Sequence, residues 1–199
     1  MSAINAEDLS IHYGDKVVIR DFTYRFDKGC YAFVGPNGSG KSSLLRVLAG
    51  LEKNFTGNLI LPFEGKLNEK RSYLPDTPKF YPFIRVHEFI NMVCKIRSVD
   101  ADKYLARFGD VFQVSSIQDQ KMNSLSLGQT KRVFCLLTLL DECPIWILDE
   151  PSNGLDAPSR EALSEAIQDH AKEGLVIMSE HNQAFLSSLP ECRQIPLGA

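Results

Sequence analysis

The stretch "FVGPNGSGKSSLLRVLAG", residues 33–50, places three glycines and a lysine within eight residues, between an apolar run and a leucine-rich segment. Residues 35–42 fit the pattern GxxxxGK[ST], after an expected buried strand and at the start of an expected helix. Glycines let backbone N–H groups approach an anion closely, and the following helix adds the positive end of its dipole. The alternative is a glycine-rich turn with an incidental lysine. The pattern favours a P-loop, in which the lysine reaches the β- and γ-phosphates and the next serine binds Mg²⁺. The expected nucleotide-binding residues are Gly35, Pro36, Asn37, Gly38, Ser39, Gly40, Lys41, Ser42 and Ser43.

The composition is that of an ordinary globular domain that can bury a core. The 199 residues are 44% hydrophobic and 24% charged, with a formal net charge of -3. That charge gives no general attraction to nucleic acid, so no nucleic-acid partner is expected. The five cysteines form no CxxC pair and no zinc-like spacing, which predicts free thiols in a reducing compartment. No signal peptide is recognisable, and no apolar run reaches the roughly 18 residues of a membrane span. We therefore expect a soluble chain whose membrane role, if any, depends on a partner.

The order of apolar runs predicts an α/β fold. "DLSIHYG" and "KVVIRDFTYRF" are typical of an antiparallel strand pair with its turn at Gly14 and Asp15. Buried strands are expected at "CYAFVG", "PIWILDEP" and "LVIMSEH", and shorter strands at "GNLILP", "RSYLPD" and "ECRQIPL". Helices are expected at "KSSLLRVLAGL", "SLGQTKRVFCLLTLL" and "PSREALSEAIQDHAKEG", and a helical region from residue 86 to about residue 114. This alternation predicts a mainly parallel sheet covered by helices, joined to an N-terminal antiparallel part and a small helical part.

Two acids close the apolar run "PIWILDE", at Asp149 and Glu150. An Asp at the end of a strand beside a P-loop can hold the Mg²⁺ shell, and an adjacent Glu can polarise an attacking water. The competing interpretation is a pair of solvated carboxylates. No Asn-Lys-x-Asp motif for guanine is found, so a GTPase is not expected.

Six segments in order resemble the motifs of the ATP-binding-cassette (ABC) ATPase family. "GPNGSGKSS" resembles the Walker A motif, "LSLGQTKR" the signature loop, "PIWILDEP" the Walker B motif and "SNGLD" the D-loop. His181 in "IMSEH" resembles the switch histidine, and Tyr13 resembles the aromatic residue that stacks on adenine. Together these segments run from about residue 8 to residue 182.

The resemblance implies a head-to-tail dimer with two ATP molecules at the interface. Each site would join one P-loop to the partner's signature loop, here Ser126, Leu127, Gly128 and Gln129. The family's catalytic roles fall on Glu150 as general base, Lys41 and His181, and its D-loop aspartate on Asp156. The resemblance also implies one ABC ATPase domain over residues 1–199. Its core would be residues 1–75 and 130–199, and its helical subdomain about residues 76–129.

Two positions depart from the family pattern. The signature loop usually has glycine where this chain has Leu127, and a β-carbon disfavours a positive φ there. We expect this to be tolerated because Ser126 and Gly128 are kept. Asp76 stands where the family commonly has glutamine, and we expect it to join the metal site with Ser42 and Asp149. The alternative is a plain loop carboxylate.

Residues 77–86, "TPKFYPFIRV", form a proline-rich loop with an apolar cluster of Phe80, Tyr81, Phe83 and Ile84. Exposed apolar loops often mark interfaces. By resemblance this cluster would line the groove that receives the membrane permease; the alternative is that it packs under the helical subdomain.

By its short length and its "YLPD" type of loop, the chain is also similar to short haem-exporter ATPase subunits of cytochrome c maturation. We therefore expect an ATPase that uses ATP and Mg²⁺ to drive a separate permease, which by this resemblance is an exporter. It would pair as a homodimer and lie in the cytoplasm on the inner face of the cell membrane. The alternative is a soluble ABC ATPase in an assembly role, such as iron–sulfur cluster assembly.

Overall fold

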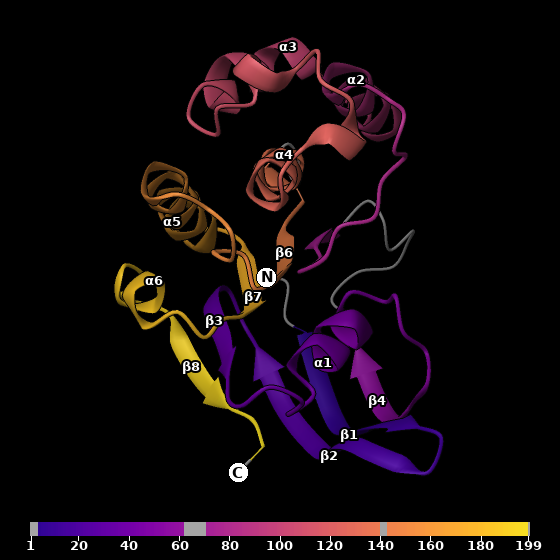
Figure 1. Ribbon diagram of the computed structural model, residues 1–199. Coiled ribbons are helices and arrows are strands. Elements are labelled where there is room, and N and C mark those ends of the chain that lie inside the picture. The colour runs from indigo at the N-terminus through magenta and orange to yellow at the C-terminus, as the bar shows by residue number, and fades with distance from the viewer. Residues whose placement is uncertain (1–3, 62–70, 140–142, 199) are drawn as a thin grey trace.

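The computed structural model describes residues 4–61, 71–139 and 143–198, and it contains two β-sheets (Figure 1). The smaller sheet is antiparallel, with strand order β2-β1-β4. Strands β1 and β2 form a hairpin in which Tyr13 pairs with Lys16, and Gly14 occupies the turn with a φ of 59°. The strands are β1 (Ile4–Tyr13), β2 (Lys16–Phe26) and β4 (Phe55–Ile60).

The larger sheet is parallel and has the strand order β5-β6-β7-β3-β8. An early strand of the chain, β3, therefore lies between two late ones. All five strands run in the same direction, so their carboxyl ends meet at one edge of the sheet. The strands are β3 (Gly29–Val34), β5 (Arg71–Leu74), β6 (Ile145–Asp149), β7 (Leu175–Ser179) and β8 (Arg193–Pro196).

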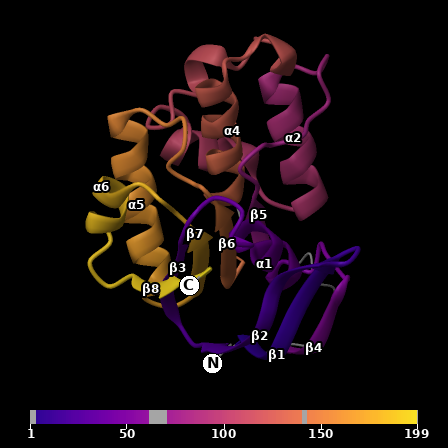
Figure 2. The ribbon, with the colours of Figure 1, turned by 60° about the horizontal axis from the view of Figure 1, so that its bottom comes forward.

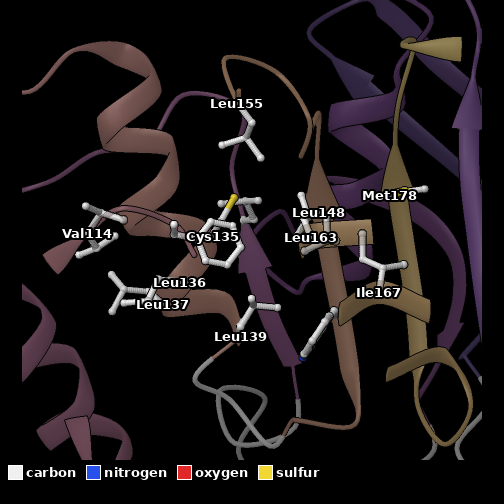
Figure 3. Close-up of a cluster of buried hydrophobic side chains, with 14 of the residues drawn as sticks. Val114, Cys135, Leu136, Leu137, Leu139, Leu148, Leu155, Leu163, Ile167 and Met178 are labelled. Atoms are coloured by element: carbon white, nitrogen blue, oxygen red, sulfur yellow. The ribbon is translucent and has the colours of Figure 1, made fainter. Parts of the chain in front are cut away.

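Each face of the parallel sheet is covered by its own hydrophobic core. Side chains alternate along a strand, so Trp146 and Leu148 of β6 face one core while Ile145 and Ile147 face the other. Helices cover the first face, and Figure 3 shows part of that core. The other face packs on the antiparallel sheet and on α1, the helix Lys41–Leu48.

The longer helices lie on one side of the parallel sheet, as Figures 1 and 2 show. The expected helical region beyond residue 86 is broken: α2 (Val86–Arg97) ends at Ser98, whose φ is 57°. A short helix, α3 (Ala101–Tyr104), and a π-helical turn (Leu105–Gly109) follow. The remaining helices are α4 (Leu127–Leu139), α5 (Ala157–Ala171) and α6 (Gln183–Ser187).

The structure has the expected fold class, with a parallel sheet, an antiparallel sheet and a helical part. Helix α6 was not among the expected helices; Asn182 caps it by accepting hydrogen bonds from two backbone N–H groups. None of the five cysteines, all of which lie within the described ranges, forms a disulfide. Within the described ranges, no helix has both the length and the apolar character needed to cross a bilayer. The division of the chain near residues 76 and 130 stays a prediction.

Candidate functional site

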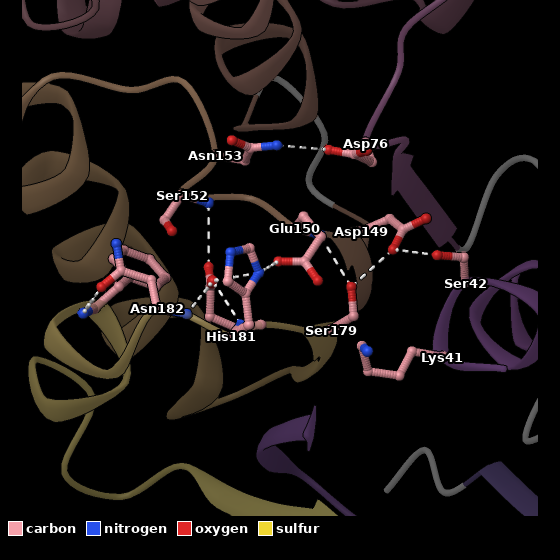
Figure 4. Close-up of polar contacts among 12 residues, drawn as sticks. Lys41, Ser42, Asp76, Asp149, Glu150, Ser152, Asn153, Ser179, His181 and Asn182 are labelled. Carbon is pink, nitrogen blue, oxygen red and sulfur yellow. Dashed lines mark hydrogen bonds and ion pairs between the residues drawn. The ribbon is translucent and has the colours of Figure 1, made fainter. Parts of the chain in front are cut away.

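Polar residues lie at the carboxyl ends of four neighbouring strands of the parallel sheet, and therefore at one edge of it. The P-loop follows β3, Asp76 follows β5, Asp149 and Glu150 end β6, and His181 follows β7. Because the strands are parallel, residues far apart in the sequence converge there. Figure 4 shows these side chains around the ends of the strands.

The P-loop lysine is folded back onto its own loop. Lys41 is buried, and its Nζ donates to the carbonyl oxygens of Gly35 at 2.8 Å and Pro36 at 2.9 Å. Gly40, the residue before α1, has a φ of 93°, and a β-carbon there would lie 2.7 Å from the side chain of Ile19. Glycine is therefore required at this point of the loop. Ser39 Oγ is buried with no hydrogen-bond partner among the described residues, so the loop holds an unused donor.

Three hydroxyl and carboxyl groups form a chain beside the P-loop. Ser42 Oγ donates to Asp149 Oδ1 at 2.9 Å, and Ser179 Oγ donates to the same oxygen at 2.7 Å. Ser179 Oγ also accepts from the backbone N–H of Glu150 at 3.0 Å. Tyr73 lies nearby, and burial, followed by the charge of Asp149, raises the pKa of its phenol. The Ser42–Asp149 pair offers hard oxygen donors of the kind that Mg²⁺ prefers.

Glu150 and His181 are in direct contact. Glu150 Oε2 lies 2.5 Å from His181 Nδ1. Glu150 also has a φ of 47°, a backbone conformation that is uncommon for a residue other than glycine. Burial raises the pKa of this carboxyl, while the hydrogen bond to His181 opposes the shift. A half-buried carboxylate fixed by a histidine is suited to accept a proton from water.

Glu180 is a functional candidate that the sequence analysis missed. The side chain is fully buried. Its Oε1 accepts from the backbone N–H groups of His181 at 2.8 Å and Asn182 at 2.9 Å, and its Oε2 accepts from that of Ser152 at 3.3 Å. Glu180 therefore fixes the backbone of His181 relative to the segment after Glu150.

Lys131 is a second residue that the sequence analysis missed. Its side chain is 2% exposed, and burial lowers the pKa of its ammonium group. Lys131 Nζ donates to the carbonyl oxygens of Pro75 at 3.2 Å, Asp76 at 3.3 Å and Asp149 at 3.2 Å. It thus connects α4 to the ends of both β5 and β6.

The side chain of Asp76 faces the D-loop in this structure. Its Oδ1 accepts from Asn153 Nδ2 at 3.2 Å and lies 3.9 Å from Lys131 Nζ. The expected role of Asp76 at a metal stays a prediction, as does its alternative role as a loop carboxylate.

The signature segment forms a capping box at the start of α4. Ser126 Oγ accepts from the backbone N–H of Gln129 at 3.2 Å, and Gln129 Oε1 accepts from that of Ser126 at 2.8 Å. Leu127 is the first residue of α4, has no positive φ and is 64% exposed, so its β-carbon causes no backbone strain. Gly128 packs against the D-loop, where an added β-carbon would lie 2.6 Å from the carbonyl oxygen of Gly154.

Two further expected site residues lie away from the Glu150–His181 pair. Asp156 caps α5 by accepting from the backbone N–H of Ser159 at 3.1 Å, and this bonding lowers its pKa. It also accepts from Arg132 Nη1 at 3.3 Å. Tyr13 is 40% exposed at the end of β1, and its hydroxyl accepts from Arg46 Nη2 at 3.2 Å. The structure therefore brings Lys41, Ser42, Asp149, Glu150 and His181 together at one edge, whereas the contacts of Ser126, Gly128 and Gln129 lie in α4 and at the D-loop.

The chain is similar in sequence to known proteins. The family model described as "ABC transporter" matches residues 20–153. The lantibiotic transport ATP-binding protein SrtF of Streptococcus pyogenes is 28% identical over 181 residues, covering 88% of this chain and 78% of that protein. The cytochrome c biogenesis ATP-binding export protein CcmA of Reclinomonas americana is 29% identical over 195 residues, covering 91% and 88%.

The fold has a solved counterpart. A structure described as the ATP binding subunit of an ABC transporter superposes with a TM-score of 0.83. It covers 98% of this chain and 85% of its own, at 24% sequence identity, so it supports the fold alone.

Proposed function

Because this chain belongs to the ABC transporter family and is an ATPase of that family, we propose that it couples ATP hydrolysis to a separate membrane permease, as an exporter. The observation that carries the hydrolytic part is the joint placement of Ser42, Asp149 and the Glu150–His181 pair at one sheet edge. The export part rests on relatives whose names describe export or lantibiotic transport.

The residues present fit ATP and Mg²⁺. The P-loop offers Lys41, the unused Ser39 hydroxyl and the positive end of α1 to phosphate oxygens. Ser42 and Asp149 converge to 2.9 Å and would hold Mg²⁺, with Asp76 as a further candidate. When bound, Mg²⁺ neutralises phosphate charge. Lys41 would exchange its two carbonyl partners for phosphate oxygens, which makes the loop respond to the nucleotide.

Glu150 is the proposed general base. It would take a proton from the attacking water, and its raised pKa brings it closer to the basicity that such a role requires. His181 would orient the carboxylate and contact the γ-phosphate. Tyr13 would stack on adenine.

We propose that the partner copy completes each site. Ser126 and Gly128 lie at the amino end of α4, where backbone N–H groups face outward, and Leu127 is exposed beside them. In a head-to-tail homodimer these residues would face the other copy's γ-phosphate, with Gln129 keeping the capping box and Asp156 fixing the D-loop.

The proposed permease surface is the loop after β5. Tyr81 is 67% exposed and Phe83 is 76% exposed, whereas Phe80 and Ile84 pack partly against the core. Two exposed aromatic side chains beside the helical part are suited to receive a short helix of the permease, at the inner face of the cell membrane. The helical subdomain, about residues 76–129, would carry this surface.

The hydrolytic proposal is tested with Glu150→Gln. We expect kcat for ATP hydrolysis to fall by about 10²–10⁴-fold while ATP still binds, because the base is lost and the P-loop is kept. Glu165→Gln, on the exposed side of α5, is the matched control and should hydrolyse ATP normally. Unchanged hydrolysis in Glu150→Gln would refute the assignment of the base.

The transport proposal is tested by capture from solubilised native membranes with tagged Glu150→Gln protein, ATP and Mg²⁺. A polytopic membrane protein should be captured, and adding Phe83→Ser should reduce the capture. Ile60→Ser, on the exposed side of β4, is the control for loss of an apolar surface residue. If only soluble proteins are recovered, the proposal of a transporter subunit is refuted in favour of an assembly ATPase.

A further inference from the structure

Two cysteines that are distant in the sequence meet at the amino end of the parallel sheet. Cys30 Sγ, on β3, lies 3.1 Å from Cys192 Sγ, although 162 positions separate the residues. The parallel β3–β8 register pairs Tyr31 with Arg193. Cys30 and Cys192 each stand one residue before this pair, so they lie side by side in the same register. Neighbouring strands lie about 4.8 Å apart, which is within the roughly 4.4–6.8 Å between the Cα atoms of disulfide-linked residues. A disulfide therefore fits with little movement of the backbone.

The two thiols differ in access. Cys30 is buried, whereas Cys192 is half-buried and both line an open cavity of about 600 Å³. The cavity lies between α5 and the segment before β8, and Lys28, Lys172 and Arg193 are on its wall. A small polar oxidant can reach Cys192 from this side.

The two thiols also differ in acidity. The hydrogen bond from Cys30 lowers the pKa of Cys192, and the same contact raises the pKa of Cys30. A thiolate is the reactive form of cysteine. Cys192 is therefore suited to react first and Cys30 to resolve the product.

The other three cysteines serve as internal references. Cys94, Cys135 and Cys143 are all buried. Burial raises the pKa of Cys94 and raises that of Cys135 to about 12. Reaction confined to the remaining pair would therefore reflect its local geometry and not general exposure of thiols.

We propose that Cys30 and Cys192 form a peroxide-reactive dithiol site that is converted into a disulfide. In the first step the Cys192 thiolate attacks one oxygen of hydrogen peroxide, the O–O bond breaks, and a sulfenic acid and one water form after protonation. In the second step Cys30 Sγ attacks Cys192 Sγ, the S–O bond breaks, and a second water leaves with the thiol proton. Two thiols and one peroxide thus give one disulfide and two waters.

The disulfide would fasten the late strand β8 to the early strand β3. The crosslink lies at the amino end of β3, while the P-loop follows its carboxyl end. The segment after β8 already reaches that end, where the N–H of Leu197 donates to the carbonyl oxygen of Val34 at 2.8 Å. We therefore expect a more stable fold with nucleotide binding kept within about twofold, an expectation independent of the proposed transport function.

The test exposes the purified full chain to hydrogen peroxide, blocks free thiols by alkylation and maps the peptides by mass spectrometry. The expected product joins the Cys30 and Cys192 peptides, is two hydrogen atoms lighter and disappears with dithiothreitol, while Cys94, Cys135 and Cys143 are alkylated. Recovery of Cys30 and Cys192 as separate alkylated or over-oxidised peptides would overturn the proposal.

Two variants separate the roles of the thiols. Cys30→Ser should accumulate a Cys192 sulfenic acid that reacts with dimedone, and Cys192→Ser should form neither product. The Tm of the oxidised wild type should exceed that of the reduced wild type by roughly 5–15 °C, with no such difference in Cys192→Ser. Equal Tm values for both wild-type forms, with the crosslink present, would refute the fastening of β8.

Discussion

Replacing Glu180 with glutamine tests whether a buried carboxylate holds the proposed active site together. The substitution keeps the size of the side chain and removes one negative charge. The amide oxygen can still accept from the backbone N–H groups of His181 and Asn182, as Glu180 Oε1 does at 2.8 and 2.9 Å. The amide nitrogen would then face the N–H of Ser152, which now donates to Oε2 at 3.3 Å. Two donors would oppose each other at that position.

The cost can be worked from these three bonds. Turning two charge-assisted bonds into neutral ones costs about 1 kcal/mol each, and leaving the Ser152 N–H without an acceptor costs about 1–3 kcal/mol. A neutral amide is less expensive to bury than a carboxylate, which offsets part of that loss. We expect the free energy of unfolding to fall by about 2–4 kcal/mol, equivalent to a Tm lower by roughly 4–16 °C.

Two assays check the prediction at a temperature where the variant is fully folded. Urea unfolding gives the stability difference, and steady-state hydrolysis gives kcat and KM for ATP. Displacement of the His181 backbone should lower kcat by about 10-fold or more and change KM by less than about twofold. Glu165→Gln, on the surface of α5, is the control and should match the wild type. Wild-type kcat in Glu180→Gln would show that the carboxylate supports the fold but does not position the histidine.

Three further outcomes are expected. Gly128→Ala should lower the ATPase rate about 10-fold or more. The β-carbon of the new alanine would lie 2.6 Å from the Gly154 carbonyl oxygen and must push α4 away from the D-loop. An ATPase rate equal to that of the wild type would contradict the importance of this contact. Lys131→Met should destabilise the fold by about 1–3 kcal/mol in urea unfolding, because three carbonyl groups lose their donor, and an unchanged midpoint would disprove the role of these bonds. Burial lowers the pKa of His170, which stacks on Trp146, so the unfolded chain binds its proton more readily and stability should decline as the pH falls below about 6.5. The decrease in Tm from pH 7.5 to pH 5.5 should be smaller in His170→Phe than in the wild type. Equal decreases in Tm would exclude this histidine as a source of the pH dependence.

The P-loop and the strand ends could be predicted because their signals are local. The spacing of Gly35, Gly40 and Lys41 specifies a loop between a strand and a helix, and the apolar run before Asp149 specifies a buried strand. The start of α4 was also predictable, because Ser126 and Gln129 have the spacing of a capping box.

The remaining site residues depend on tertiary contacts that no short spacing encodes. Lys131 stands among polar neighbours in "QTKRV", which is equally typical of an exposed helix entry, and its burial follows from where α4 meets β5 and β6. Glu180 directly precedes His181 in the sequence, and no spacing marks it as a separate site residue. Its role follows from the hydrogen bond that the backbone N–H of Ser152 donates to it. The Cys30–Cys192 contact requires knowing that β8 lies beside β3. Likewise, the break at Ser98 depends on one left-handed residue within an otherwise helical pattern.

The position of β3 between β7 and β8 has a consequence for how the chain folds during synthesis. β3 is made early, yet both of its neighbours in the sheet are made late. Until those strands leave the ribosome, the apolar residues of β3 have no partner strand, and the P-loop that follows β3 is not anchored to a formed sheet. Nucleotide can therefore stabilise only a chain that has been synthesised through β8, and we expect nascent intermediates of this protein to depend on chaperones that cover the exposed strand β3.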